Sequence, residues 1–184
     1  PPHLAVITGF VFLTAGVVPF AYADPNTSFM MIVIYGLIGR WATAFVQPFI
    51  MNTALNSLPE DKLNAGGGTL NFCRQLVGSL GTNLWVVFVD RRIDFHASTL
   101  TATQSSAAAT SAELLRAVDK IYREAGVPEA VHQAGGLHYL GQIIEAQANV
   151  LGFQDGFWVL AASYAIGIIP AWFMGRMYYE NKRK

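Results

Sequence analysis

Two arginines lie inside long apolar stretches of this 184-residue sequence, where a charged side chain is costly. Arg40 falls near the middle of one stretch, and Arg74 lies in the first half of the next. No Asp or Glu lies deep in any of these stretches, so neither guanidinium has an anionic partner within them. Charges in such places face a protein interior or a water-filled path. Arg40 and Arg74 are therefore candidates for lining or gating a transport cavity. The alternative is that they only join helices or reach a lipid headgroup.

Polar and small residues recur at helical spacing around each arginine. Positions three, four and seven residues apart share one face of an α-helix. One polar stripe consists of Gly36, Arg40, Thr43 and Gln47, and the other of Asn71, Arg74, Gln75 and Gly78. We expect the substrate cavity or its gate to be formed by Arg40, Thr43, Gln47, Asn71, Arg74 and Gln75. Helix packing is expected at Gly36, Gly78 and Gly81, because small residues let a second helix approach closely.

The elements that must position these stripes are four apolar stretches, at about 4–23, 29–55, 65–89 and 157–175. A hydrocarbon core of about 30 Å is crossed by roughly 20 apolar residues in a helix. The stretches are far longer than a β-strand, and prolines inside them, such as Pro48, are tolerated in membrane helices. The predicted fold class is an all-α integral membrane protein, with two inner helices that carry the polar stripes and two apolar outer helices.

A hydrophilic insert at 91–152 separates the third and fourth predicted spans. It contains a helical stripe, which Gly126 and Pro128 should end. The stripe consists of Leu114, Leu115, Val118, Ile121 and Tyr122. A second helical stretch, at about 138–150, leads towards the last span. The segment 97–109 is rich in Ala, Ser and Thr and lacks the apolar content for a core. We expect the insert to be a mobile, partly helical cap.

Lysine and arginine in short flanking segments predict the orientation in the membrane, because they favour the cytoplasmic side. The tail carries four of them, at Arg176, Lys182, Arg183 and Lys184. Four spans then place the insert outside, and Arg91 and Arg92 in it are compatible because long loops escape the rule. The predicted organisation is three spans in 1–90, an extracytoplasmic loop in 91–152, and the last span with a cytoplasmic basic tail in 153–184.

Composition and motifs argue against several other classes of function. Only 13% of the residues are charged and 53% are hydrophobic, whereas soluble domains carry about a quarter charged residues. The formal net charge is zero, which gives no indication of a nucleic-acid partner. The single cysteine, Cys73, permits no internal disulfide. The histidines are scattered, as ordinary surface or interfacial residues are, at His3, His96, His132 and His138. Without a metal-ligand spacing, a nucleophile–base pair or a phosphate loop, we expect neither a cofactor nor an enzymatic activity.

The segment around the second arginine resembles a known family. It reads Ser57-Leu58-Pro59-Glu60, then Ala65-Gly66-Gly67-Gly68, then Asn71-Phe72-Cys73-Arg74-Gln75-Leu76-Val77-Gly78-Ser79-Leu80-Gly81. This pattern is similar to the penultimate helix of the EmrB/QacA-type drug:proton antiporters, the fourteen-span branch of the major facilitator superfamily. Val77 departs from the family pattern, which usually has glycine at this position, and Gly67 departs from it where the family often has serine. The Arg74–Gln75 pair is kept. The long insert before the last span and the run 147–157 are similar to that family as well.

The resemblance implies that the four spans are the last four of fourteen, in the C-terminal part of a major facilitator bundle. The second span would line the central cavity, the third would pack where the two halves meet, and the halves would rock around a midplane site. The implied function is proton-coupled multidrug efflux across the bacterial inner membrane, with the proton-titrating carboxylates on the missing N-terminal helices. The implied partners are a drug-like substrate, protons, the lipid bilayer, the missing N-terminal helices and a periplasmic adaptor protein. The alternatives are a transporter of the same superfamily for a non-drug solute, and a stand-alone four-span structural or partner protein.

Overall fold

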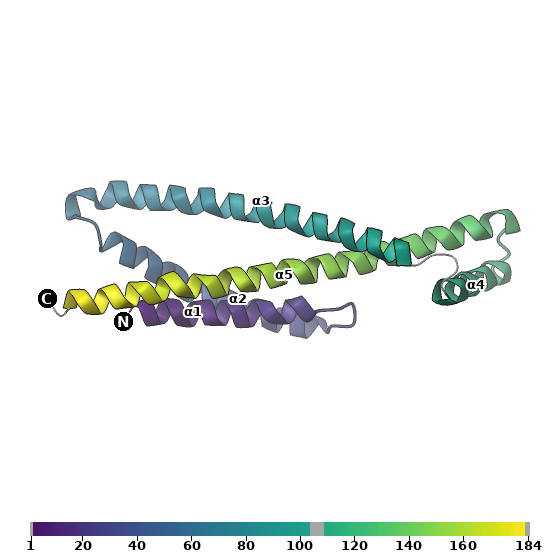
Figure 1. The fold of residues 1–184 in the computed structure, drawn as a ribbon, viewed down its shortest axis with the longest axis horizontal. Helices are drawn as coiled ribbons and strands as arrows, with labels where there is room; N and C mark the ends of the chain where they lie inside the picture. Colours follow the sequence, from purple (N-terminus) through teal and green to yellow (C-terminus); the bar gives the residue numbers. More distant parts are fainter. Residues whose placement is uncertain (1, 104–108, 183–184) are drawn as a thin grey trace. The chain divides into compact units, whose positions relative to one another are not determined.

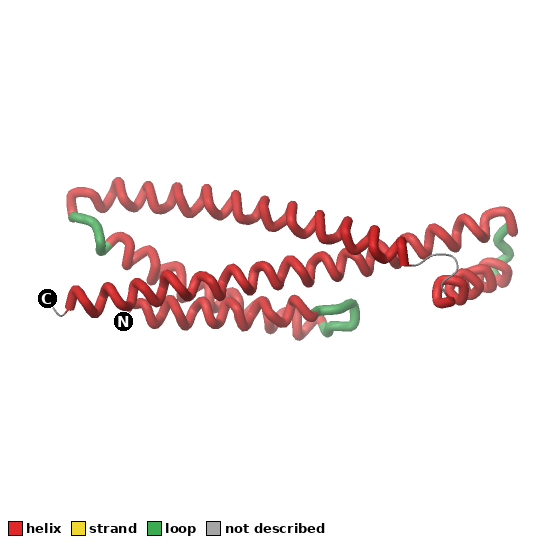
Figure 2. The backbone as a smooth tube through the Cα atoms, in the orientation of Figure 1, coloured by secondary structure: helices red, strands yellow, loops and turns green. Residues whose placement is uncertain are grey.

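The computed structural model describes the main chain of residues 2–103 and 109–182, and the side chains of residues 3–103 and 111–173. All the regular structure in these residues is helical (Figure 1, Figure 2). The α-helices are α1 (Pro2–Val17), α2 (Phe29–Leu55), α3 (Leu63–Thr103), α4 (Ala109–Glu124) and α5 (His132–Lys182), and the 3-10 helices are η1 (Val18–Tyr22), η2 (Glu60–Lys62) and η3 (Glu129–Val131). The predicted all-α class is confirmed.

Within this described part, four helical segments are long and apolar enough to cross a bilayer. They are His3–Tyr22, Phe29–Leu55, Glu60–Thr103 and Glu129–Phe173. A span of the hydrocarbon core needs roughly 20 residues of helix, which each segment provides. The chain is therefore a membrane protein with four candidate membrane-spanning helices, as the apolar stretches of the sequence predict.

Helices α3 and α5 run beyond the apolar stretches that predict them. The first continues past Val89 to Thr103, and the second begins at His132, well before the last predicted span. Helical hydrogen bonds are local, so polar residues can extend a helix outside the hydrocarbon. The division into spans, outer loop and tail stays a prediction, as does the mobility of the segment 97–109. The side chains of the tail cations Arg176, Lys182, Arg183 and Lys184 lie outside the described ones.

The chain divides into two compact units. One comprises Pro1–Val87 with Gln154–Lys184, and we call it the membrane unit. The other comprises Phe88–Phe153, and we call it the insert unit. The predicted site residues all belong to the membrane unit, so its packing decides how they are held.

The core of the membrane unit lies between α1 and α2. Leu13 of α1 is buried with Ala42 and Val46 of α2, and Phe10 and Tyr164 pack against them. The two helices approach most closely at Gly16, where an added Cβ would lie 3.0 Å from the main-chain nitrogen of Gly39. A close approach of this kind needs small residues at the contact, because only they leave room for the neighbouring backbone.

Aromatic rings from four elements meet in the membrane unit. Phe20 of η1 stacks on Phe157 of α5, with ring centroids 5.1 Å apart, and meets Tyr35 of α2 edge-on at 5.8 Å. Trp85 of α3 tilts against the same Phe157 at 6.1 Å. Aromatic residues are enriched where membrane helices reach the water interface. These rings therefore favour a membrane boundary at this level of the four helices.

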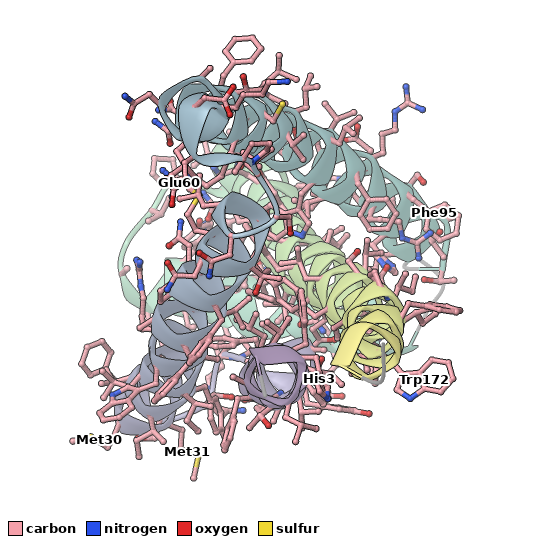
Figure 3. All side chains as sticks on the ribbon, turned by 90° about the vertical axis from the view of Figure 1, so that its left-hand side faces the viewer. His3, Met30, Met31, Glu60, Phe95 and Trp172 are labelled. Carbon is pink, nitrogen blue, oxygen red and sulfur yellow. The ribbon has the colours of Figure 1, made fainter. Side chains whose placement is uncertain are left out.

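The outward faces of the membrane unit are apolar. Met30 and Met31 of α2 and Trp172 of α5 point away from the packed helices (Figure 3) and are 63%, 51% and 58% exposed. Large contiguous apolar surfaces of this kind mark contact with lipid or with other proteins. The unit is thus built for surroundings of hydrocarbon or further helices.

The insert unit is held by the apolar face of α4. Val118 and Ser111 are buried, and Leu115 and Tyr122 lie where a Cβ on Gly136 or Gly135 of α5 would touch them. Ile121 of the predicted stripe is 60% exposed. It lies at the edge of the stripe, where a small rotation of the helix turns a side chain to solvent.

Candidate functional site

Helix α2 presents the first predicted stripe to its surroundings. Arg40, Thr43 and Gln47 are all exposed, and we call them the α2 polar face. The neighbouring face carries Ala42 and Val46, which are buried in the contact with α1. That contact fixes the rotation of α2 about its axis and so determines where the polar face points.

The hydrogen-bond needs of the α2 polar face are met unequally. Thr43 Oγ1 donates to the main-chain oxygen of Gly39 at 2.9 Å, so its hydroxyl proton is used within the helix. In the described part of the chain, Arg40 has no hydrogen-bond or ion-pair partner. Its guanidinium offers five N–H donors and no acceptor, so it requires oxygen atoms from outside these helices.

Pro48 adds a free acceptor next to this face. It lies inside α2 and carries no N–H, so the main-chain oxygen of Ala44 loses its usual helical donor. In hydrocarbon such a carbonyl must find another donor or water. The Ala44 carbonyl and the Gln47 side chain together make this turn of α2 polar within an otherwise apolar helix.

Helix α3 presents the second predicted stripe, Asn71, Arg74 and Gln75, which we call the α3 polar face. All three residues are exposed. Arg74 Nη2 donates to Asn71 Oδ1 at 2.9 Å, one helical turn away, which draws the guanidinium along the helix. Between the described residues, no hydrogen bond joins Arg74 and Gln75. Most of the Arg74 donors therefore remain available to a partner outside the chain.

The structure does not bring the two polar faces together. Helix α2 packs on α1. All six residues are exposed, and no hydrogen bond between described residues joins the α2 polar face to the α3 polar face. The six predicted residues thus form two separate polar faces and not one closed pocket. Whatever completes the site must come from outside these helices.

The predicted packing glycines also lack neighbours within the described chain. A Cβ added at Gly36, Gly78 or Gly81 would meet nothing within 4 Å. Their expected role in helix packing stays a prediction that needs a helix from elsewhere. The close contacts lie instead at glycines that the sequence analysis did not single out, namely Gly9, Gly16 and Gly167. Gly9, Leu13 and Gly16 share one helix face, and this spacing was the signal that could have identified them.

One comparison with known proteins gives a match. The chain is 26% identical over 151 residues to the multidrug export protein EmrB of Haemophilus influenzae, which covers 82% of the chain and 28% of that protein. The chain therefore spans little more than a quarter of the length of this relative. No family model matches the chain, and no solved structure matches it. The match to EmrB confirms that the chain resembles EmrB-type transporters.

Proposed function

We propose that the chain is the C-terminal portion of a multidrug efflux transporter that works by proton-coupled antiport. The observation that carries the proposal is the pair of polar faces on α2 and α3, each with an arginine that has no acidic partner among the residues that the structure describes. The likeness to EmrB supplies the class of transported molecule. The implied location is the bacterial inner membrane.

The energetics favour a larger bundle around these faces. A guanidinium at the centre of a bilayer costs a few kcal/mol or more when it faces lipid. The same group is stable when it borders a water-filled cavity or bonds to carbonyls and carboxylates of other helices. Arg40 and Arg74 therefore favour a chain that contributes its polar faces to a cavity completed by the missing N-terminal helices.

The two polar faces have different roles in this proposal. The α2 polar face lines the cavity, where Arg40, Gln47 and the free carbonyl beside Pro48 contact water and substrate. The α3 polar face lies where the two halves of the bundle meet. There Arg74, whose guanidinium donates to Asn71, stabilises one of the two conformations of the transporter. The protons are titrated by carboxylates outside this chain. A periplasmic adaptor protein is a further proposed partner, for which the insert unit offers the outer surface.

The test is efflux of a drug-like dye by the full-length transporter, normalised to its amount in the membrane. Arg74→Ala leaves a partner group unsatisfied, at about 1–3 kcal/mol, which shifts a two-state equilibrium about tenfold or more. We expect efflux to fall accordingly, and Arg74→Lys to recover only part of it because the planar fork is lost. The control is Lys62→Ala, since Lys62 is an exposed residue of η2 outside both polar faces.

The outcomes separate the proposal from its alternatives. Wild-type efflux by Arg74→Ala would mean that this arginine serves only insertion or helix contact. A full-length protein that inserts but exports no dye, with or without a proton gradient, would contradict the multidrug proposal and support transport of a non-drug solute. Dye export that does not respond to collapse of the proton gradient would contradict proton coupling but not multidrug efflux.

A further inference from the structure

The insert unit contains a buried histidine that the sequence analysis treated as an ordinary surface or interfacial residue. His132 begins α5, and its side chain is only 7% exposed. The ring lies beside α4, with its centroid 5.7 Å from that of Tyr122. A buried polar ring needs partners for its nitrogens, so the geometry around both of them decides its state.

Both ring nitrogens of His132 face oxygen atoms. Nδ1 lies 2.9 Å from Oδ1 of Asp119, and Nε2 lies 2.8 Å from the main-chain oxygen of Val127. A carbonyl oxygen only accepts hydrogen bonds, and so does an ionised carboxylate. A neutral imidazole has one N–H and would turn a lone pair towards one of these oxygens. Only the doubly protonated imidazolium donates to both.

The local structure holds both acceptors in place. Asp119 Oδ2 accepts from Arg123 Nε at 2.9 Å, which keeps the carboxylate oriented with its other oxygen towards His132. Helix α4 ends at Glu124 and is followed by Gly126, whose φ of 72° favours glycine. Gly126 N donates to Arg123 O, and Val127 N donates to Tyr122 O. This is a Schellman ending, and it fixes the peptide whose oxygen meets the ring.

We propose that His132 is a pH-sensitive clip, which as an imidazolium fastens the end of α4 to the start of α5 and releases it on deprotonation. The clip consists of His132, Asp119 and the Val127 carbonyl. The contacts between the two helices at Leu115 and Tyr122 are apolar or aromatic packing and remain. Deprotonation therefore loosens the α4 end of the insert unit without unfolding it.

The electrostatic surroundings of His132 favour the protonated ring, as the hydrogen-bond geometry does. The hydrogen bonds to the Val127 carbonyl and to Asp119 raise the pKa of His132 above its usual 6.5, against desolvation and the charge of Arg123. The hydrogen bond from His132 lowers the pKa of Asp119 below its usual 3.8, and Arg123 lowers it further. Among the described residues, the charged groups that act on His132 are Asp119 and Arg123, and Tyr122 is the titratable ring beside it.

The pH range of the clip follows from these directions. The pKa of His132 is higher in the folded chain, so its stabilisation is complete below 6.5 and is lost as pH rises through the folded pKa. The pKa of Asp119 is lower in the folded chain, so its stabilisation is complete above 3.8 and is lost as pH falls through the folded pKa. The insert unit thus responds to a rise in pH above 6.5 in the compartment that it faces.

The experiment is hydrogen exchange of the purified chain in detergent micelles, followed in peptides that cover 111–127 between pH 5.5 and 9. Rates are corrected for the intrinsic pH dependence of exchange. We expect the opening of α4 to increase with pH by up to about tenfold for each unit by which the folded pKa of His132 exceeds 6.5. His132→Gln should abolish this dependence. His138→Gln should keep it, because His138 is exposed and, among the described residues, bonds only to Gln142.

A second measurement keeps the proposal testable even if His132→Gln weakens the whole insert. The ring nitrogens of His132 can be titrated by NMR in the unsubstituted chain, and Asp119→Asn should lower the midpoint. A His132 midpoint at or below 6.5 would overturn the proposal. So would α4 protection that is independent of pH, or the same pH dependence in His132→Gln.

Discussion

Trp85 of α3 donates its indole N–H to the main-chain oxygen of Gly156 in α5, over 3.0 Å. The same indole ring lies against Phe157, the neighbour of Gly156, so one residue joins the two long helices by a hydrogen bond and by ring contact. A second bond, from Gln154 Nε2 to the main-chain oxygen of Ala23 at 2.8 Å, ties α5 to the turn after η1. A buried tryptophan N–H normally finds such a partner. The Trp85 bond joins α3, which carries the α3 polar face, to α5, and the Gln154 bond joins α5 to the turn after η1.

Replacing Trp85 by phenylalanine should destabilise the membrane unit modestly. The change removes the N–H but keeps an aromatic ring against Phe157, so the expected loss is about 0.5–1.5 kcal/mol for one hydrogen bond. The measurement is unfolding of the purified chain in mixed micelles by increasing SDS. Trp172→Phe is the matched control, because Trp172 faces outward and is 58% exposed. Equal effects of the two changes would contradict a special role for the Trp85–Gly156 bond.

Alanine at Gly16 and at Gly39 should have opposite effects, although the two residues face each other. A Cβ on Gly16 would lie 3.0 Å from the Gly39 backbone, so α1 and α2 must separate, at about 1–3 kcal/mol. A Cβ on Gly39 would meet nothing within 4 Å. Gly39→Ala should therefore be neutral or stabilise the helix by up to about 1 kcal/mol, because alanine favours helix over glycine.

The same SDS titration measures both glycine variants. It reports α1–α2 packing best when the fluorescence of Trp41, which lies in α2 on the apolar groove between these helices, is followed. A loss of stability in Gly39→Ala as large as in Gly16→Ala would contradict this prediction. It would mean that a Cβ at Gly39 also meets the opposite helix.

The sequence was sufficient for the fold class because the length of an apolar stretch directly reflects the thickness of the bilayer. The sequence was insufficient for the ends of α3 and α5, because hydropathy indicates which residues lie in the hydrocarbon and not where a helix begins or ends. Thr99, for example, lies in the polar end of α3, and its hydroxyl donates to the main-chain oxygen of Phe95 at 2.8 Å. The backbone hydrogen bonds that continue the helix there are local and need no apolar residues.

Contacts between distant residues were harder to predict than elements. The approach of Gly16 to Gly39 and the bond of His132 to Asp119 each depend on which helices pack together, and a single sequence does not specify that pairing. For the candidate site, helical spacing was enough to group Arg40 with Gln47 and Arg74 with Asn71. What covers the two polar faces could not be derived, because helical spacing groups residues on one helix and does not identify the groups that face them.

The insert unit should lie on the extracytoplasmic side of the membrane, and the loop between α2 and α3 should lie in the cytoplasm. The physical reason is the bias of lysine and arginine in short flanking segments, which the basic residues of the tail express. The measurement uses single cysteines in the full-length protein with Cys73 replaced by serine, because Cys73 is exposed. Ser57→Cys reports the loop and Lys120→Cys reports the insert, and both positions are exposed. A membrane-impermeant maleimide should label Lys120→Cys in intact cells and Ser57→Cys only after permeabilisation. The reverse pattern would invert the chain in the membrane, and the pH clip at His132 would then face the cytoplasm.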